Sequence, residues 1–260
     1  MEELNNKKVI LSVITVCYNN KEGLERTMKS VCSQTFKGKE WIVVDGGSTD
    51  GSLDFIKHHS ALIDNYISEP DNGIYDAMNK GIKQANGEWI ICMNAGDCFT
   101  DSNTLYSIFS HSIGKDIMAI YSDFWQATSH GEAALCRMDR GKGMLMHQSF
   151  IYRKKIHLEH GYYLVTKPYI NSDLLFMLSI PSEQCMKTSI PISLNDCGGV
   201  SQRGTWCDEA ALGLLTAFRI HSLPKAFILF CKARLKAFLP ESYKIWIKKR
   251  ILKREYIRIN

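Results

Sequence analysis

The sequence predicts an α/β protein in which a sheet is flanked by helices. Over the first hundred residues, short apolar segments rich in β-branched residues alternate with segments of helical periodicity, which is typical of βαβ units and a parallel sheet. The loops that follow the apolar segments are rich in Asp, Asn and Gly. A chain of 260 residues, 45% of them apolar, is long enough to bury the core of such a domain.

Each predicted element follows from its own residue pattern. The apolar run at residues 9–16 predicts the first strand, and Leu24, Met28 and Val31 are spaced to turn one face of a helix over residues 21–33 toward the sheet. The Gly-rich segment 45–51 predicts a tight strand-to-helix turn. Further strands are expected at 41–44, 66–68, 88–93, 116–121, 144–152 and 190–196, and further helices at 52–59, 74–85, 102–110 and 172–178.

Four polar loops each follow a predicted strand, at residues 18–20, 45–51, 69–73 and 94–97. In an open α/β sheet the carboxyl ends of the parallel strands meet at one edge, and ligands bind there. The sequence therefore predicts a nucleotide-sized site at this edge.

The composition and the termini argue against several other classes of protein. The first residues lack the basic flank and small-residue cleavage site of a secretory signal, and no stretch approaches the roughly 18 apolar residues that span a bilayer. The nine cysteines are odd in number and form no C-x-x-C pair, so neither a disulfide framework nor a cysteine zinc site is indicated. A cytoplasmic location is expected.

Positive charge is concentrated in the last part of the chain. Residues 218–260 hold 12 Lys and Arg against two Glu, whereas residues 1–217 hold 20 against 25 acidic residues. From Asp208 onward the pattern is helical and amphipathic, with breaks expected at Pro224 and Pro240. We therefore expect a first domain over residues 1–207 and basic amphipathic helices over 208–260.

This basic segment is expected to bind an anionic membrane surface, which attracts Lys and Arg while apolar side chains insert at the interface. Two alternatives stay open: a helix pair that makes a homo-oligomer, and a helix that covers the body with its basic face in solvent. Nucleic acid is not expected as a partner, because the polar loops are acidic and no nucleic-acid module is present.

Five segments of the chain resemble, in order and spacing, the family 2 glycosyltransferases of the GT-A fold, in particular the colanic-acid, capsule and O-antigen branch. The segments are SVITVCYN (12–19), SVCSQTF (30–36), VDGGSTDG (44–51), SEPDNGIYDAMNKG (68–81) and MNAGD (93–97). The resemblance implies a Rossmann-like mixed sheet and an enzyme of surface polysaccharide biosynthesis. Such an enzyme transfers a sugar from a nucleotide-diphospho-sugar to a glycan acceptor, expected to be lipid-linked, with inversion and at the inner face of the cell membrane.

Residues for the nucleotide are expected at the ends of the first two strands. Asp45 is placed to accept a hydrogen bond from a base N–H or a ribose hydroxyl, as the resemblance also implies. Thr15, Tyr18 and Asn19 end the first strand, where backbone or side chain can hold the base. The alternative for these three residues is ordinary capping of the strand end.

The segment after Pro70 supplies further candidates for donor binding. Asp71 lies in the loop, and Asp76 and Asn79 are three apart on the next helix, so both point to the same surface. Fixing the loop is the alternative role for all three.

Asp97 is the expected metal ligand, because it follows a strand at the place where the family carries its Asp-x-Asp motif. The second acid of that motif is missing, so the amide of Asn94 and the donor diphosphate must supply further oxygens. Such hard oxygen ligands suit Mg²⁺ or Mn²⁺, bound weakly until the nucleotide-sugar arrives. The alternative is that Asp97 only caps the helix at 102–110.

An inverting transfer needs a base for the acceptor hydroxyl, and the resemblance assigns this role to Asp173 at the start of a helix. A helix N-terminus stabilises the charged carboxylate, so geometry rather than a raised pKa has to deliver the proton transfer. His147 resembles the family's His-Gln pair and is expected near the metal or the diphosphate. The alternatives are an N-terminal helix acid for Asp173 and a packed side chain for His147.

Two other functions compete with this interpretation. A sugar nucleotidyltransferase shares such a sheet, but its Gly-rich basic loop after the first strand is absent here, as is the G-x-G-x-x-G of a dinucleotide oxidoreductase. A protein that keeps the fold as a non-catalytic binding module is the second rival, and the incomplete metal motif favours it.

Overall fold

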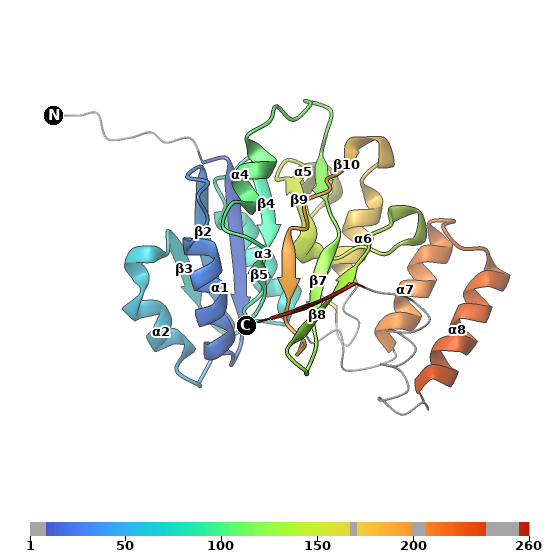
Figure 1. The fold of residues 1–260 in the computed structure, drawn as a ribbon, viewed down its shortest axis with the longest axis horizontal. Coiled ribbons are helices and arrows are strands. Elements are labelled where there is room, and N and C mark those ends of the chain that lie inside the picture. Colours follow the sequence, from blue (N-terminus) through green and yellow to red (C-terminus); the bar gives the residue numbers. More distant parts are fainter. Residues whose placement is uncertain (1–8, 167–170, 199–205, 238–254, 260) are drawn as a thin grey trace.

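The structure is a computed structural model that describes residues 9–166, 171–198, 206–237 and 255–259. Two sheets form its centre, with helices on both sides (Figure 1). The seven-stranded sheet has the order β10-β6-β9-β4-β1-β2-β3, and the five-stranded sheet has the order β12-β8-β7-β11-β5. The layered α/β architecture predicted from the sequence is confirmed.

The first sheet contains β1 (Leu11–Cys17), β2 (Lys39–Asp45), β3 (Asn65–Ser68), β4 (Trp89–Cys92), β6 (Ala119–Tyr121), β9 (Phe150–Arg153) and β10 (Cys185–Lys187). The second sheet contains β5 (Cys98–Phe99), β7 (Phe124–Ala127), β8 (Glu132–Cys136), β11 (Ser193–Asn195) and β12 (Tyr256–Arg258). The α-helices are α1 (Lys21–Cys32), α2 (Ser52–His58), α3 (Ile74–Gln84), α4 (Thr104–Phe109), α5 (Ile156–His160), α6 (Ser172–Ser179), α7 (Trp206–Ala217) and α8 (Leu223–Ala237).

The continuous apolar character of β1 and β2 follows from burial on both faces. Ile14 and Val44 belong to one core cluster together with Met78 of α3. Val13, one position away on β1, belongs to the opposite cluster together with Leu24 of α1. Alternate residues of one strand thus pack on different helix layers, which holds β1 at the centre of the molecule.

The large sheet is mixed, as the resemblance implied. β1 pairs in parallel with β2 and β4, and β2 pairs in parallel with β3. β9 runs antiparallel to both β4 and β6. β9 therefore runs opposite to the other strands of the sheet, because β10 pairs in parallel with β6.

Several expected elements differ from the structure. Of the strand expected at 144–152, only the end is extended, because a 3₁₀ turn at His147–Ser149 precedes β9. The strand expected at 190–196 is limited to β11. The short strands β5, β7, β8 and β10 were not predicted.

The basic C-terminal segment is only partly the helical tail that the sequence predicts. α8 begins at Leu223 and carries Pro224 in its first turn, where the missing N–H is not needed, so the break lies between α7 and α8. Pro240 lies outside the described residues. Tyr256–Arg258 pairs antiparallel with β8 instead of continuing a helix, because its backbone completes the edge of the second sheet.

α7 and α8 form a helical hairpin beside the sheets, at the right of Figure 1. Leu215 of α7 joins a small apolar cluster with Leu174 and Leu178 of α6. Gly143 lies directly under Leu215, and a Cβ at this glycine would overlap a methyl carbon of the leucine. Within the described ranges, none of the helices is long and apolar enough to cross a bilayer.

Candidate functional site

The candidate site lies at the carboxyl edge of the large sheet, the lower edge in Figure 1. The last residues of three strands are in register, because Cys17 pairs with Asp45 and Asp45 pairs with Ser68. The loop after β4 joins the same edge, since Asn20 donates a 2.8 Å hydrogen bond to the Ala95 carbonyl oxygen. The four polar loops therefore converge as the sequence predicts.

Two of the expected nucleotide residues are buried in the loops and core that build this edge. The Asp45 carboxylate is 0% exposed and accepts from the Ser48 N–H at 3.2 Å and the Ser68 hydroxyl at 2.7 Å. The Thr15 hydroxyl is also 0% exposed and accepts from the indole N–H of Trp41 at 2.9 Å. Both side chains therefore stabilise the strand ends through buried hydrogen bonds.

Gly46 is buried under two side chains of this edge. Tyr18 is 66% exposed, and the Asp71 carboxylate fills the place that a Cβ at Gly46 would take. Asn19 has a left-handed backbone with φ of 47°, and its Oδ1 accepts from the Thr49 N–H at 2.8 Å. An exposed aromatic ring and a partly exposed carboxylate thus cover the Gly46 backbone.

Asp76 and Asn79 make the hydrogen bonds expected of residues that fix loops rather than bind the donor. The Asp76 carboxylate accepts from the Asn72 N–H at 2.9 Å. The Asn79 amide donates to the Tyr163 carbonyl oxygen at 2.8 Å and accepts from the Tyr163 N–H at 3.0 Å. These side chains hold the loops on either side of the site.

Asp97 is almost enclosed, with 5% of its surface exposed. Its Oδ1 accepts from the Asp196 N–H and its Oδ2 from the Gln148 amide, both at 2.8 Å. Burial raises the pKa of Asp97 to about 6, and the two N–H donors only partly oppose that effect. Asp97 is therefore a carboxyl group whose charged form needs further positive partners.

The residues around Asp97 fit a hard cation that the donor helps to bind. Asn94 Oδ1 and Gln148 Oε1 are buried oxygens without a hydrogen-bond partner. Amide and carboxylate oxygens are ligands that Mg²⁺ and Mn²⁺ accept. Among the described side chains, no group of three or more His, Cys, Asp or Glu could hold a metal ion, so further oxygens would have to come from a ligand.

A second carboxylate cluster is centred on Asp173, in the first turn of α6. Its Oδ2 lies 2.7 Å from His147 Nδ1, and its Oδ1 accepts from the Tyr75 hydroxyl at 2.7 Å. His147 Nε2 in turn lies 3.0 Å from the Asn94 amide nitrogen. Three residues expected from the sequence thus form one chain of contacts, and Tyr75 is an addition that the sequence reasoning missed.

The Asp173 side chain is only 16% exposed, yet its pKa is lowered. Burial alone would raise the pKa, but the hydrogen bonds from His147 and Tyr75 stabilise the charged form and outweigh it. Burial and the adjacent carboxylate raise the pKa of the Tyr75 hydroxyl far above its usual value. The cluster therefore holds a charged carboxylate between two donors at neutral pH.

The sequence profile of glycosyl transferase family 2 matches residues 12–157, more than half of the chain. The chain belongs to this family. An uncharacterized glycosyltransferase of Mycobacterium tuberculosis is 35% identical over 134 residues, which cover 51% of this chain and 49% of that protein. The chain thus matches about half the length of this relative. A PGL/p-HBAD biosynthesis glycosyltransferase of Mycobacterium bovis is 27% identical over 204 residues, 74% of this chain and 79% of that protein.

Solved structures of glycosyltransferases share the family 2 fold seen here. Staphylococcus aureus TarS 1–349 in complex with UDP-GlcNAc superposes with a TM-score of 0.65 at 18% identity, covering 90% of this chain and 69% of TarS. A mannosyltransferase of Pyrobaculum calidifontis in complex with GDP-Man and Mn²⁺ gives 0.54 at 15% identity, covering 92% and 83%. The expected GT-A fold is confirmed.

Proposed function

We propose that this family 2 protein is a glycosyltransferase that moves a sugar from a nucleotide-diphospho-sugar to the hydroxyl of a glycan acceptor. The observation that carries the proposal is the charged Asp173 carboxylate, held between Tyr75 and His147 beside the loops of the carboxyl edge. The nucleotide-sugars named for the two solved relatives support the donor class.

The donor nucleotide is proposed to lie against Tyr18 and Asp71, the two side chains that cover Gly46. The exposed ring of Tyr18 offers a face on which a base can stack. Asp71 accepts from the base or ribose, while Asp45 and Asn19 keep the loops that form this surface in place.

The diphosphate is proposed to lie toward Asp97, with Mg²⁺ or Mn²⁺ held by Asp97 and by Asn94 Oδ1. When bound, such a cation neutralises the charge that develops on the leaving diphosphate. The amide of Gln148 donates to Asp97 Oδ2 and so restrains the carboxylate. The Mn²⁺ named for the mannosyltransferase supports the choice of a divalent cation.

Asp173 is proposed to take the proton of the acceptor hydroxyl as its oxygen bonds to the anomeric carbon and the bond from that carbon to the diphosphate breaks. Its low pKa makes it a weak base, so His147 and Tyr75 contribute by holding the carboxylate in one orientation. A direct displacement of this kind inverts the anomeric centre.

The acceptor is further proposed to be lipid-linked, in surface polysaccharide biosynthesis, with the enzyme bound peripherally to the inner face of the cell membrane. The biosynthetic role named for the mycobacterial relative and the basic C-terminal segment support this part of the proposal. The rival is a donor-binding protein without turnover, which the single acidic residue of the metal motif favours.

Release of nucleoside diphosphate from a panel of nucleotide-sugars tests the proposal, with Mg²⁺ or Mn²⁺ and then with a chelator. We expect release from one donor that requires the cation and rises with a glycan acceptor. Asp173→Asn should reduce the acceptor-dependent rate about 10²- to 10⁴-fold. Asp54→Asn, an exposed acid on α2, is the matched control and should leave the rate unchanged. Donor binding without release under any condition would favour the non-catalytic rival.

A further inference from the structure

The N-terminal part of α8 exposes large apolar side chains instead of burying them. Leu223, Phe227 and Ile228 are 75%, 67% and 53% exposed. Leu223 and Phe227 are four residues apart, so they lie on one face of the helix. On α1, by contrast, the apolar residue Leu24 is fully buried. Contiguous exposed apolar side chains of this size mark a surface that meets another phase or partner.

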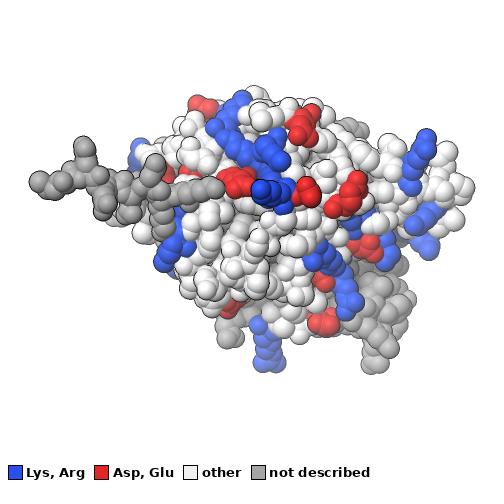
Figure 2. Space-filling view, turned by 90° about the horizontal axis from the view of Figure 1, so that it is seen from above, with Lys and Arg blue, Asp and Glu red and all other residues white. Residues whose placement is uncertain are grey.

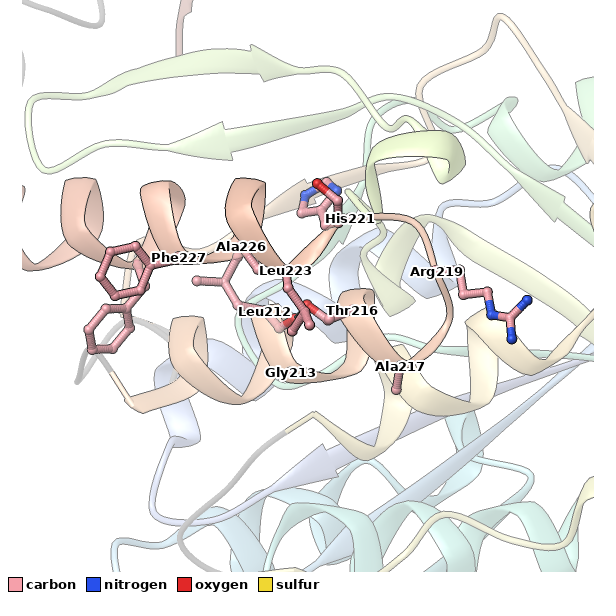
Figure 3. Close-up of a pocket in the computed structure, with 11 residues that line it drawn as sticks. Leu212, Gly213, Thr216, Ala217, Arg219, His221, Leu223, Ala226 and Phe227 are labelled. Atoms are coloured by element: carbon pink, nitrogen blue, oxygen red, sulfur yellow. Dashed lines mark hydrogen bonds between the residues drawn. The ribbon is translucent and has the colours of Figure 1, made fainter.

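An apolar groove of about 770 Å³ continues this surface between α7 and α8. Figure 3 shows Leu212 and Leu223 facing each other across the groove, with Phe227 at one end and Arg219 at the other. The groove walls are mainly aliphatic and aromatic. A hydrocarbon chain matches this lining, whereas a polar glycan does not.

The charge of the hairpin indicates what kind of apolar partner it meets. Residues 211–237 contain five Lys and Arg and no Asp or Glu. The side chains of Lys225 and Lys232 are exposed on α8. At the right-hand end of Figure 2, where the hairpin lies, the atoms are white and blue without red. Apolar side chains among basic ones are complementary to anionic lipid, with acyl chains below negative headgroups.

We propose that the α7–α8 hairpin docks on a bilayer containing anionic lipid, with Leu223, Phe227 and Ile228 among the acyl chains and Lys225 at the headgroups. This inference deepens the proposed function and rests on it for the lipid-linked acceptor. Leu215 of α7 packs on α6, the helix that carries Asp173 in its first turn. Docking through this hairpin therefore brings the proposed base close to the membrane surface from which a lipid-linked hydroxyl approaches.

Vesicle sedimentation with the full-length chain tests the docking surface. Native protein should bind vesicles of phosphatidylcholine mixed with phosphatidylglycerol, bind phosphatidylcholine alone much more weakly, and be released by salt. Phe227→Ser should weaken binding roughly tenfold, and the triple change of Leu223, Phe227 and Ile228 to Ser should weaken it further. Lys225→Gln should weaken binding to the anionic vesicles about fivefold.

Matched controls lie on other helices. Leu158→Ser on α5 removes a side chain that is 88% exposed, and Lys57→Gln on α2 removes an exposed cation, so neither should change vesicle binding. Because all the changed side chains are exposed, far-UV circular dichroism and donor-dependent nucleotide release in solution should stay native. Hydrogen exchange should slow in residues 223–232 when anionic vesicles are added.

Three outcomes would overturn the proposal. Equal binding of native protein and the triple variant to anionic vesicles would assign docking to another surface. Failure of the native chain to sediment with any vesicle would refute membrane docking. A dimer in light scattering that Phe227→Ser dissociates would make a second copy the occupant. Loss of nucleotide release with normal vesicle binding would instead refute the proposed function and leave the docking surface intact.

Discussion

Asp97 and Asp173 are both largely enclosed carboxyl groups at the same edge of the sheet, yet their surroundings move their pKa values in opposite directions. Around Asp97, burial dominates over two N–H donors and raises the pKa to about 6. Around Asp173, the hydrogen bonds from His147 and Tyr75 outweigh burial and lower the pKa. The difference shows that the strength and charge of the donors, rather than burial alone, decide how readily each acid loses its proton.

This contrast divides the work that we propose for the site. Asp173 is charged and oriented before any substrate binds, as a proton acceptor must be. Burial makes the charge of Asp97 less favourable, and a cation bound with the donor diphosphate would stabilise it, so binding of the two is expected to be coupled. The following experiments change the residues around Asp97 and around Asp173 separately.

The largest effect is expected from breaking the contact between His147 and Asp173. Asp173→Asn and His147→Ala should each lower the turnover of sugar transfer by about two orders of magnitude or more. The double variant should be little worse than Asp173→Asn alone, because both residues act as one unit. Transfer rates of the four proteins at saturating donor measure this coupling.

His58→Ala, at an exposed position on α2, is the control for loss of an imidazole and should keep native turnover. Independent losses that multiply in the double variant would contradict a shared role for His147 and Asp173.

The next largest effect is on the pH dependence of the free energy of unfolding, and it depends on Asp97 alone. Because the folded pKa of about 6 lies above the ordinary 3.8, protonation favours the folded state. This stabilisation is present below about pH 4 and is lost as the pH rises to about 6, a change of at most about 3 kcal/mol. Asp97→Asn removes the titration, so its free energy of unfolding should lack this decrease.

Urea unfolding of the native chain and of Asp97→Asn between about pH 4 and pH 7 measures the difference. Asp173→Asn is the comparison and should keep the decrease due to Asp97 in this window. The pKa of Asp173 is lowered, so its own stabilisation is present above the unfolded pKa and is lost only as the pH falls from there through the folded value. Parallel curves for the native chain and Asp97→Asn would contradict the raised pKa.

The smallest effect is expected from Tyr75→Phe, which removes one of the two donors to Asp173. The pKa of Asp173 should rise, so the acid limb of the pH–rate profile should move to higher pH. Unfolding should become easier by only about 1 kcal/mol, since one hydrogen bond is lost and the ring remains. Tyr106→Phe, at an exposed tyrosine, should change neither quantity. An unchanged acid limb would show that the Tyr75 hydroxyl does not affect the pKa of Asp173.

The first half of the fold was predictable because its elements are long and strongly patterned. α1 and α3 carry one apolar stripe each, and β1 and β2 are apolar on both faces, as expected between two helix layers. The strands of the second half have five residues or fewer, which is too short for a period of two to be distinguished. β12 was expected to be helical for the same reason.

The candidate site was predictable in part. Asn94, His147 and Asp173 are far apart in the sequence, and the family resemblance rather than any spacing brought them together. Tyr75 was missed because an aromatic residue at the start of a helix predicts core packing, and no pattern of apolar residues reports the partner of its hydroxyl. Asp76 and Asn79 share one helix face as expected, but the structure uses their hydrogen bonds to fix loops.

The pairing of β12 with β8 has a consequence for how such a chain can vary. β11 and β12 belong to the same five-stranded sheet, so the segment between them, which includes the α7–α8 hairpin, is anchored at both ends. The entropy of closing a loop grows only slowly with its length, so this segment can be exchanged for a longer or shorter one at little thermodynamic cost. The segment that carries the proposed docking surface can therefore differ between related chains while the two sheets stay the same.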